Sequence, residues 1–167
     1  MSDALTALAG LQDYLNQQGL STFLLSPDAS SGIAEPQLLV TRDEGTYVLR
    51  LFFDTDWMSG TLLQFLVALP VSPRPERFAD LARLAAVSNR LIPSGCFAVF
   101  PDQAEENFVL RHGLLAVTHS PAIVAEICRE MLYLAKVFHP WVEACATGSR
   151  ELDTIVDELS RRFGAAA

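Results

Sequence analysis

Two neighbouring segments, Tyr47–Phe53 and Thr61–Leu69, consist mainly of apolar, aromatic and β-branched residues and are separated by a short loop. For Thr61–Leu69 the apolar run alone does not separate a strand from a buried helix, but its length and residue types favour a strand. Strands joined by a short connection pair in the antiparallel sense. The chain is therefore predicted to contain an antiparallel sheet.

Further strands are expected where short apolar runs lie between turn-forming residues: Thr22–Leu25, Gln37–Thr41, Cys96–Phe100 and Asn107–His112. Helices are expected where apolar residues recur at helical spacing: Asp3 to Gly19, Ser72–Asn89, Ser120–Phe138 and a short segment around Leu152 to Leu159. Pro140 is expected to kink or end the third helix, because proline removes a helical donor. The predicted class is α+β, with an antiparallel sheet of five to six strands, helices packed on it, and the order α-β-β-β(-β)-α-β-β-α-α.

The length of the chain fits a single domain over residues 1–167, with residues 148–167 as a candidate C-terminal extension helix. Half of the residues are hydrophobic and 19% are charged, so there is ample material for one core. The formal net charge is −8, from twelve basic and twenty acidic residues. A negative field repels phosphate backbones, so we expect no nucleic-acid partner.

No membrane partner is expected either, because the longest apolar run, Thr61–Val71, is interrupted and is shorter than the roughly 20 residues that span a bilayer. The N-terminal segment carries acidic residues and no lysine or arginine, unlike a secretory signal. Cys96, Cys128 and Cys145 are widely spaced among apolar neighbours and are expected to be buried, reduced thiols. The predicted location is cytoplasmic.

Element order and one segment resemble a known family. The segment Asn89–Val99 places an asparagine at a helix end and a glycine before a hairpin, and Phe108–Arg111 supplies an aromatic residue and an arginine on the second strand. This pattern is similar to the type III secretion chaperone fold and its YbjN-like relatives. The match in residues is confined to about Asn89–Leu115, whereas the match in element order covers most of the chain.

The resemblance implies a compact, often dimeric domain that binds a protein segment, and it brings no catalytic residues. The extra C-terminal helix after Gly148 departs from the family pattern and leaves the mode of assembly open.

The residue types that could carry chemistry form three pairs: Cys128 with His139, His112 with His119, and Asp54 with Asp56. The first pair is eleven residues apart on one helix, about 16 Å at a rise of 1.5 Å per residue, which is too far for a nucleophile and its base. The other two pairs lack further ligands at metal-binding spacing. No nucleotide-binding or nucleophile-elbow motif occurs. We therefore expect no enzyme, no metal and no cofactor, with an enzyme acting through Asp54, Asp56 and His112 as a remote alternative.

The remaining candidate for a functional site is the second face of the predicted sheet, which is apolar. If Leu49, Leu51 and Phe53 face the helices, the residues that alternate with them along the strand face outward. In the adjacent run, Thr61–Leu69, alternate residues divide between the two faces in the same way. A sheet with one wet face would show a polar second face, so something is expected to cover this one. The candidate partner-binding residues are Val48, Arg50, Phe52, Leu62, Gln64 and Leu66, with Arg50 and Gln64 at the rim.

Three explanations for this face stay open: coverage by the chain's own C-terminal helices, a homodimer interface, or a groove for a polypeptide client. The leading functional hypothesis is a non-catalytic, chaperone- or adaptor-like protein-binding module that binds a polypeptide segment through its sheet and forms a homodimer. The alternative is a small-ligand-binding regulatory domain with a pocket between the sheet and the long helix.

Overall fold

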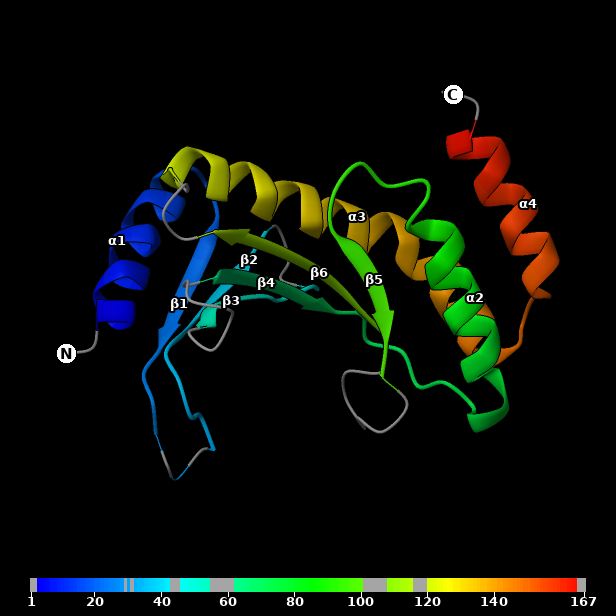
Figure 1. Cartoon of the computed structure of the whole chain (residues 1–167), viewed down its shortest axis with the longest axis horizontal. Helices are drawn as coiled ribbons and strands as arrows, with labels where there is room; N and C mark the ends of the chain where they lie inside the picture. The colour runs from blue at the N-terminus through cyan, green and yellow to red at the C-terminus, as the bar shows by residue number, and fades with distance from the viewer. Residues whose placement is uncertain are drawn as a thin grey trace. The chain divides into compact units, whose positions relative to one another are not determined.

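The computed structural model describes residues 3–28, 30, 32–42, 46–54, 62–100, 108–115 and 120–164. Its strands are β1 (Ser21–Leu25), β2 (Gln37–Thr41), β3 (Leu49–Asp54), β4 (Leu62–Ala68), β5 (Cys96–Val99) and β6 (Phe108–Leu115). Its helices are α1 (Asp3–Gln17), the short 3-10 helix η1 (Pro75–Arg77), α2 (Phe78–Ser88), α3 (Pro121–Thr147) and α4 (Leu152–Phe163). Figure 1 shows these elements. The predicted α+β class and element order are confirmed.

The six strands form one sheet in the order β1-β2-β3-β4-β6-β5, so β1 and β5 are its two edge strands. The described pairings of β1 with β2, β2 with β3, β3 with β4 and β5 with β6 are all antiparallel. By backbone proximity the chain divides into two compact units. Unit 1 comprises residues 1–67 and 112–133, and unit 2 comprises residues 68–111 and 134–167.

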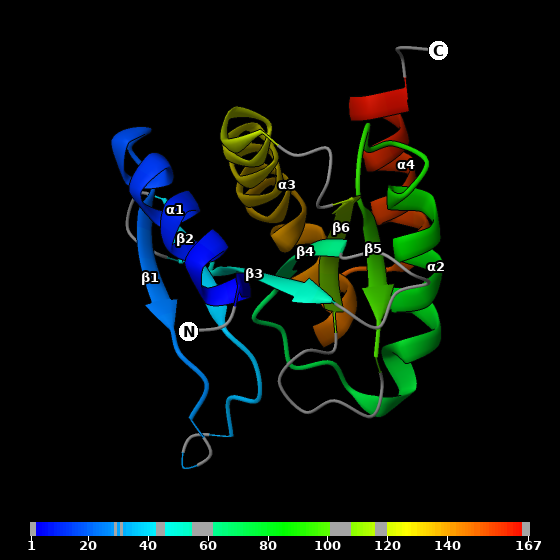
Figure 2. The same ribbon diagram turned by 60° about the vertical axis from the view of Figure 1, so that its left-hand side comes forward.

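In unit 1, one face of the sheet forms the core. Residues on this face alternate along β2, β3 and β4 and are fully or almost fully buried: Leu38, Val40, Leu49, Leu51, Phe53, Leu63, Phe65 and Val67. Helix α1 packs against β1 and β2, as Figure 2 shows, and buries Leu8, Leu11 and Leu15. Each such side chain contributes roughly 1.5–3 kcal/mol through removal from water, so this face holds the unit together.

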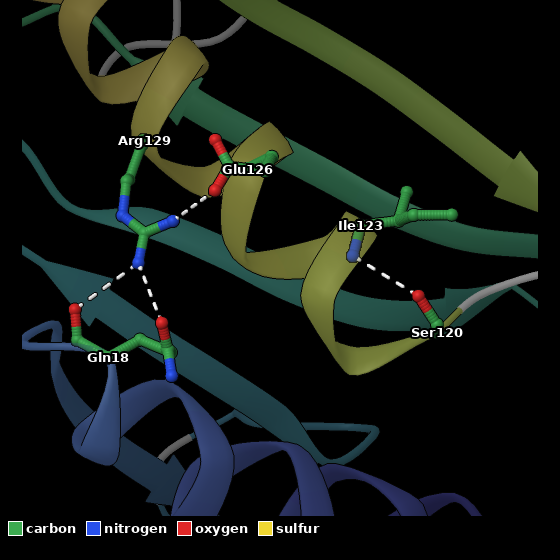
Figure 3. Close-up of polar contacts among 5 residues, drawn as sticks. All are labelled: Gln18, Ser120, Ile123, Glu126 and Arg129. Atoms are coloured by element: carbon green, nitrogen blue, oxygen red, sulfur yellow. Dashed lines mark hydrogen bonds and ion pairs between the residues drawn. The ribbon is translucent and has the colours of Figure 1, made fainter.

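A polar contact fastens the start of α3 to the end of α1. The guanidinium of Arg129 donates from Nη2 to the backbone oxygen of Gln18 and to its Oε1, both at 3.3 Å. Its Nη1 pairs with Glu126 one turn earlier on the same helix (Figure 3). Ser120 caps α3 as predicted, because its Oγ accepts from the N–H of Ile123 at 3.3 Å.

In unit 2, the core contains an aromatic cluster that brings α4 onto the second half of α3. Phe138 lies 5.0 Å from Phe97 and 5.4 Å from Phe163 between ring centroids, and Trp141 lies 6.0 Å from Phe163. Arg162 sits over the Trp141 ring at 5.3 Å, a cation–π arrangement. Helix α4 also packs on α2. The candidate extension helix is thus part of the core of its unit.

The prediction that Pro140 kinks or ends the long helix was wrong in one respect, because α3 continues for 27 residues through it to Thr147 (Figure 1). Proline at this position removes one donor and leaves the carbonyl of Lys136 without its helical partner. Both residues are exposed, so water can satisfy that carbonyl at little cost.

The second predicted helix begins later than Ser72. Arg74 has φ −70° and ψ 143°, an extended conformation, because the residue before a proline is disfavoured in the helical region. The chain becomes helical only at Pro75, first as η1 and then as α2.

Asn89 and Gly95 fix the hairpin at the β5 edge. The Asn89 side chain follows the end of α2 and makes two hydrogen bonds to the backbone of Phe97, one donated at 3.0 Å and one accepted at 2.6 Å. Gly95 has φ +72°, and a Cβ there would lie 2.8 Å from the carbonyl oxygen of Arg111. The asparagine and glycine that carry the sequence resemblance therefore have defined structural roles in this chain.

Candidate functional site

The candidate site is the face of the unit 1 sheet opposite the core, called here the outer face. Strand register aligns its residues in rows, since directly paired residues of antiparallel strands point to the same side. Phe23 pairs with Leu39, Leu39 with Arg50, and Arg50 with Leu66. Three of the four side chains in this row are apolar, and they come from four different strands. The sheet thus carries an apolar band across its outer side.

A second row lies beside the first. In it Phe52 pairs with Gln64, and Asp54 pairs with Leu62 one step further along. Phe52, Leu62 and Leu66 are half-buried, whereas Phe23 is 63% exposed. A water-facing sheet surface is ordinarily polar, so this surface has the composition of an interface.

All six predicted site residues lie on or beside β3 and β4. Five of them, on the two strands, share the outer face through the register just described. Val48 precedes the first residue of β3 and is 41% exposed. The predicted alternation is confirmed for β3, because Leu49, Leu51 and Phe53 are buried while Arg50 and Phe52 are half-buried. On β4 it is interrupted, because Gln64 is buried like its neighbours.

Gln64 differs from its predicted place at the rim. Its side chain is only 7% exposed, and its Nε2 donates to Oδ2 of Asp54 at 3.4 Å. A buried amide needs such a partner, because an unpaired one would cost about 1–3 kcal/mol. Gln64 therefore holds Asp54 within the face instead of pairing with groups at its edge.

Gly113 of β6 adjoins the Leu62 end of this face. A Cβ at Gly113 would lie 3.2 Å from the Leu62 side chain, so the absence of a side chain allows the two strands to approach there. Leu115, two residues further along β6, is 50% exposed. Apolar character thus continues beyond the residues that the sequence singled out.

Sequence reasoning missed Phe23 and Leu39 as members of the outer face. Both lie on predicted strands, and Leu39 alternates with the buried residues Leu38 and Val40. That alternation could have identified Leu39 as an outward residue, but only the register aligns Leu39 and Phe23 with Arg50 and Leu66.

The sequence also left open whether a C-terminal helix covers this face. The described contacts of α4 are with α2 and with Phe138 and Trp141 of α3, all within unit 2.

The side chains considered for catalysis have environments that suit packing. His112 lies edge-on to the Phe65 ring with centroids 5.8 Å apart, and burial lowers the pKa of its imidazole, an effect opposed by the negative charge of Glu130. Cys128 is fully buried, and burial raises the pKa of its thiol to about 12, so the nucleophilic thiolate is scarce at neutral pH. His119 and Asp56, the partners proposed for His112 and Asp54, lie outside the described residues.

The cysteines differ in exposure. Cys145 is buried, and burial raises its pKa to about 11. Cys96, predicted to be buried, is exposed, and it is the first residue of the edge strand β5. Within the described part of the chain, no group of three or more histidine, cysteine and acidic side chains is placed to hold a metal ion.

A shallow depression on α4 is lined by Asp157, Ser160 and Arg161. It is open, and it does not correspond to the pocket between sheet and long helix that a small-ligand domain would need.

Among the helices that the structure describes, none has both the length and the apolar character needed to cross a bilayer. No protein-family model matches the chain, and no curated protein matches it.

Proposed function

We propose that this chain is a non-catalytic, chaperone- or adaptor-like protein-binding module that binds a polypeptide segment through the outer face. The observation that carries the proposal is the apolar band that contains Leu39 and Leu66, with Phe52 in the row beside it, on a sheet face where polar residues are ordinarily found. A half-buried aromatic side chain in such a band is the kind of anchor that dominates protein–protein binding energies.

The apolar residues of the face define the segment that fits it. Leu39 and Leu66 lie on either side of Arg50 in one row across the sheet. We therefore infer a client segment with apolar side chains at alternating positions. The resemblance to the type III secretion chaperone fold supports the same class of function.

A cytoplasmic location belongs to the proposal. It is supported by three cysteines with no disulfide-scaffold spacing, two of them buried in positions typical of small hydrophobic residues.

The test is selection from a displayed library of random peptides, followed by mapping of the enriched peptide through amide chemical shifts. We expect shifts to change at Arg50, Phe52 and Leu66, and Phe52→Asp to weaken binding at least tenfold. Ile123→Asp is the matched control, because Ile123 is also an exposed apolar residue, at 47%, but lies on α3. Circular dichroism of both variants reports the fold. No enriched peptide, or shifts confined to other surfaces, would refute the proposal.

A further inference from the structure

The two edge strands of the sheet, β5 and β1, differ in how far they are protected against pairing with another strand. At the β5 edge, the Asn89 side chain bonds both the N–H and the carbonyl of Phe97. A backbone N–H and carbonyl that are occupied in this way are not available to another strand. The β5 edge is therefore closed at its second residue.

The opposite edge, β1, lacks the features that usually protect an edge strand. Its five residues, Ser-Thr-Phe-Leu-Leu, include no charge and no proline. All five pair in continuous register with β2, so the strand contains no bulge that would twist its edge away. A regular, uncharged edge of this kind is suited to adding one more strand.

Phe23 is the central residue of β1 and the most exposed of the large hydrophobic side chains described, at 63%. It pairs with Leu39 and therefore points to the outer face. An exposed phenylalanine on an edge strand would be covered by a side chain on an added neighbouring strand.

We propose that the strand added to β1 is β1 of a second copy of this chain, paired antiparallel about a two-fold axis through Phe23. In an antiparallel pair centred on Phe23, this residue lies opposite itself, and Ser21 lies opposite Leu25 of the second copy. Two phenylalanines are then cross-strand neighbours on one face, a pairing that favours antiparallel strands. The contact is isologous, so it closes as a dimer instead of continuing as a filament.

Charge also fits a second copy at this place. Each chain carries a formal net charge of −8, so two copies repel each other over most of their surfaces. The β1 edge contributes no charged side chain to the contact. Association through it therefore avoids opposing like charges, and added salt strengthens it by screening the remaining repulsion.

The dimer deepens the proposed function without depending on it. Pairing at β1 extends the outer face from one copy into the next, so that the two bands would join end to end at Phe23 and offer a longer surface to a polypeptide. The dimer is measured on the chain alone, without peptide, so failure of either proposal leaves the readout of the other intact.

The first experiment is sedimentation equilibrium over a concentration series. We expect the wild type to form a dimer, more tightly at high salt. Phe23→Lys places two lysines opposite each other and is expected to weaken association at least tenfold. Phe52→Lys, on the same face but two strands from the edge, is the matched control and keeps the dimer. Phe23→Thr, which preserves strand propensity, gives the same loss if Phe23→Lys does not fold.

A second experiment reads the register directly, in a Cys96→Ser background that removes the exposed thiol. Phe23→Cys is expected to form an intermolecular disulfide on mild oxidation, because directly paired cross-strand residues have Cβ atoms about 4.5–5.5 Å apart. Ser21→Cys, which lies opposite Leu25 of the second copy, is expected to remain a free thiol. A monomeric wild type, a dimer unaffected by Phe23→Lys, or equal cross-linking at both positions would overturn the inference.

Discussion

The side chain of Asn89 makes the two hydrogen bonds to Phe97 that the backbone of a neighbouring strand would otherwise make. It accepts one from the N–H of Phe97 and donates one to its carbonyl. Because Asn89 closely follows α2 and Phe97 belongs to β5, the pair joins the helix to the edge of the sheet. Two hydrogen bonds of about 0.5–1.5 kcal/mol each connect the elements.

Replacing Asn89 by alanine is therefore expected to lower the free energy of unfolding by about 1–3 kcal/mol. Urea titration followed by circular dichroism measures this change. Arg90→Ala is the control, since Arg90 is the next residue and is exposed. A loss equal to that of the control would mean that the Asn89 bonds contribute nothing net over bonds to water.

Replacement of Gly148 by any residue with a side chain is expected to destabilise the protein for two reasons. Its φ is +68°, and a Cβ would lie 2.6 Å from a guanidinium nitrogen of Arg77. The left-handed conformation alone costs a non-glycine residue about 1–2 kcal/mol, so Gly148→Ala destabilises by at least that amount. Gly10→Ala, in an exposed position on α1 with nothing near its Cβ site, is expected to stabilise the protein by about 0.5–1 kcal/mol.

The same substitution in an Arg77→Ala background separates the two causes. Removal of the guanidinium relieves the crowding but not the backbone strain, so Gly148→Ala should cost less there than in the wild type. Thermal unfolding of the four proteins of this cycle provides the comparison. Equal costs in both backgrounds would exclude crowding by Arg77.

The elements of this fold were predictable because each is encoded locally. Strands such as Gln37–Thr41 and helices with proline near their first turn carry their signals within a few residues. The placement of Pro140 inside α3 was not predictable in this way. Tolerance of a proline depends on whether the freed carbonyl meets water, which is a property of the assembled helix.

The candidate site was predictable only in part, for the same physical reason. Alternation along one strand identifies outward residues such as Phe52, but pairing between strands decides which of them meet. Phe23 joined the row of Arg50 and Leu66 through register across four strands. The burial of Gln64 and the exposure of Cys96 likewise depend on neighbours distant in sequence.

Ser88 is expected to be a stabilising site for substitution. It is fully buried in the last turn of α2, and its Oγ has no hydrogen-bond partner among the residues that the structure describes. Ser88→Ala removes this hydroxyl, and alanine has a higher helix propensity than serine. We therefore expect a gain of up to about 1 kcal/mol in the free energy of unfolding. Ser160→Ala on the exposed side of α4 reports the helix-propensity part alone. A destabilised Ser88→Ala protein would show that the hydroxyl contributes to packing.

Thiol reactivity is expected to separate the three cysteines. In the native protein at pH 8, an aromatic disulfide reagent should modify exposed Cys96 quickly, whereas burial protects Cys128 and Cys145 and raises their pKa values to about 12 and about 11. Unfolding in urea should release all three thiols. Cys96→Ser is the control and should abolish the fast phase. A fast phase of more than one thiol per chain would show that a buried cysteine is accessible.

The stability of the protein is expected to fall as the medium becomes acidic, partly through His112. Burial lowers the pKa of this imidazole below its ordinary value near 6.5, and the nearby Glu130 reduces that effect. As the pH drops below about 6.5, the unfolded chain therefore binds a proton at this histidine before the folded chain does. The stability that neutral His112 provides is present above that pH and is lost progressively down to its lowered folded pKa.

His112→Gln removes the titration while keeping a polar side chain beside Phe65. Urea unfolding at several pH values between 7.5 and 5.0 should give a smaller loss of stability for this variant than for the wild type. Carboxylates titrate in both proteins, so the difference between their slopes belongs to His112. A proton NMR titration of the imidazole gives its folded pKa independently. Identical slopes, or a folded pKa at or above 6.5, would contradict the prediction.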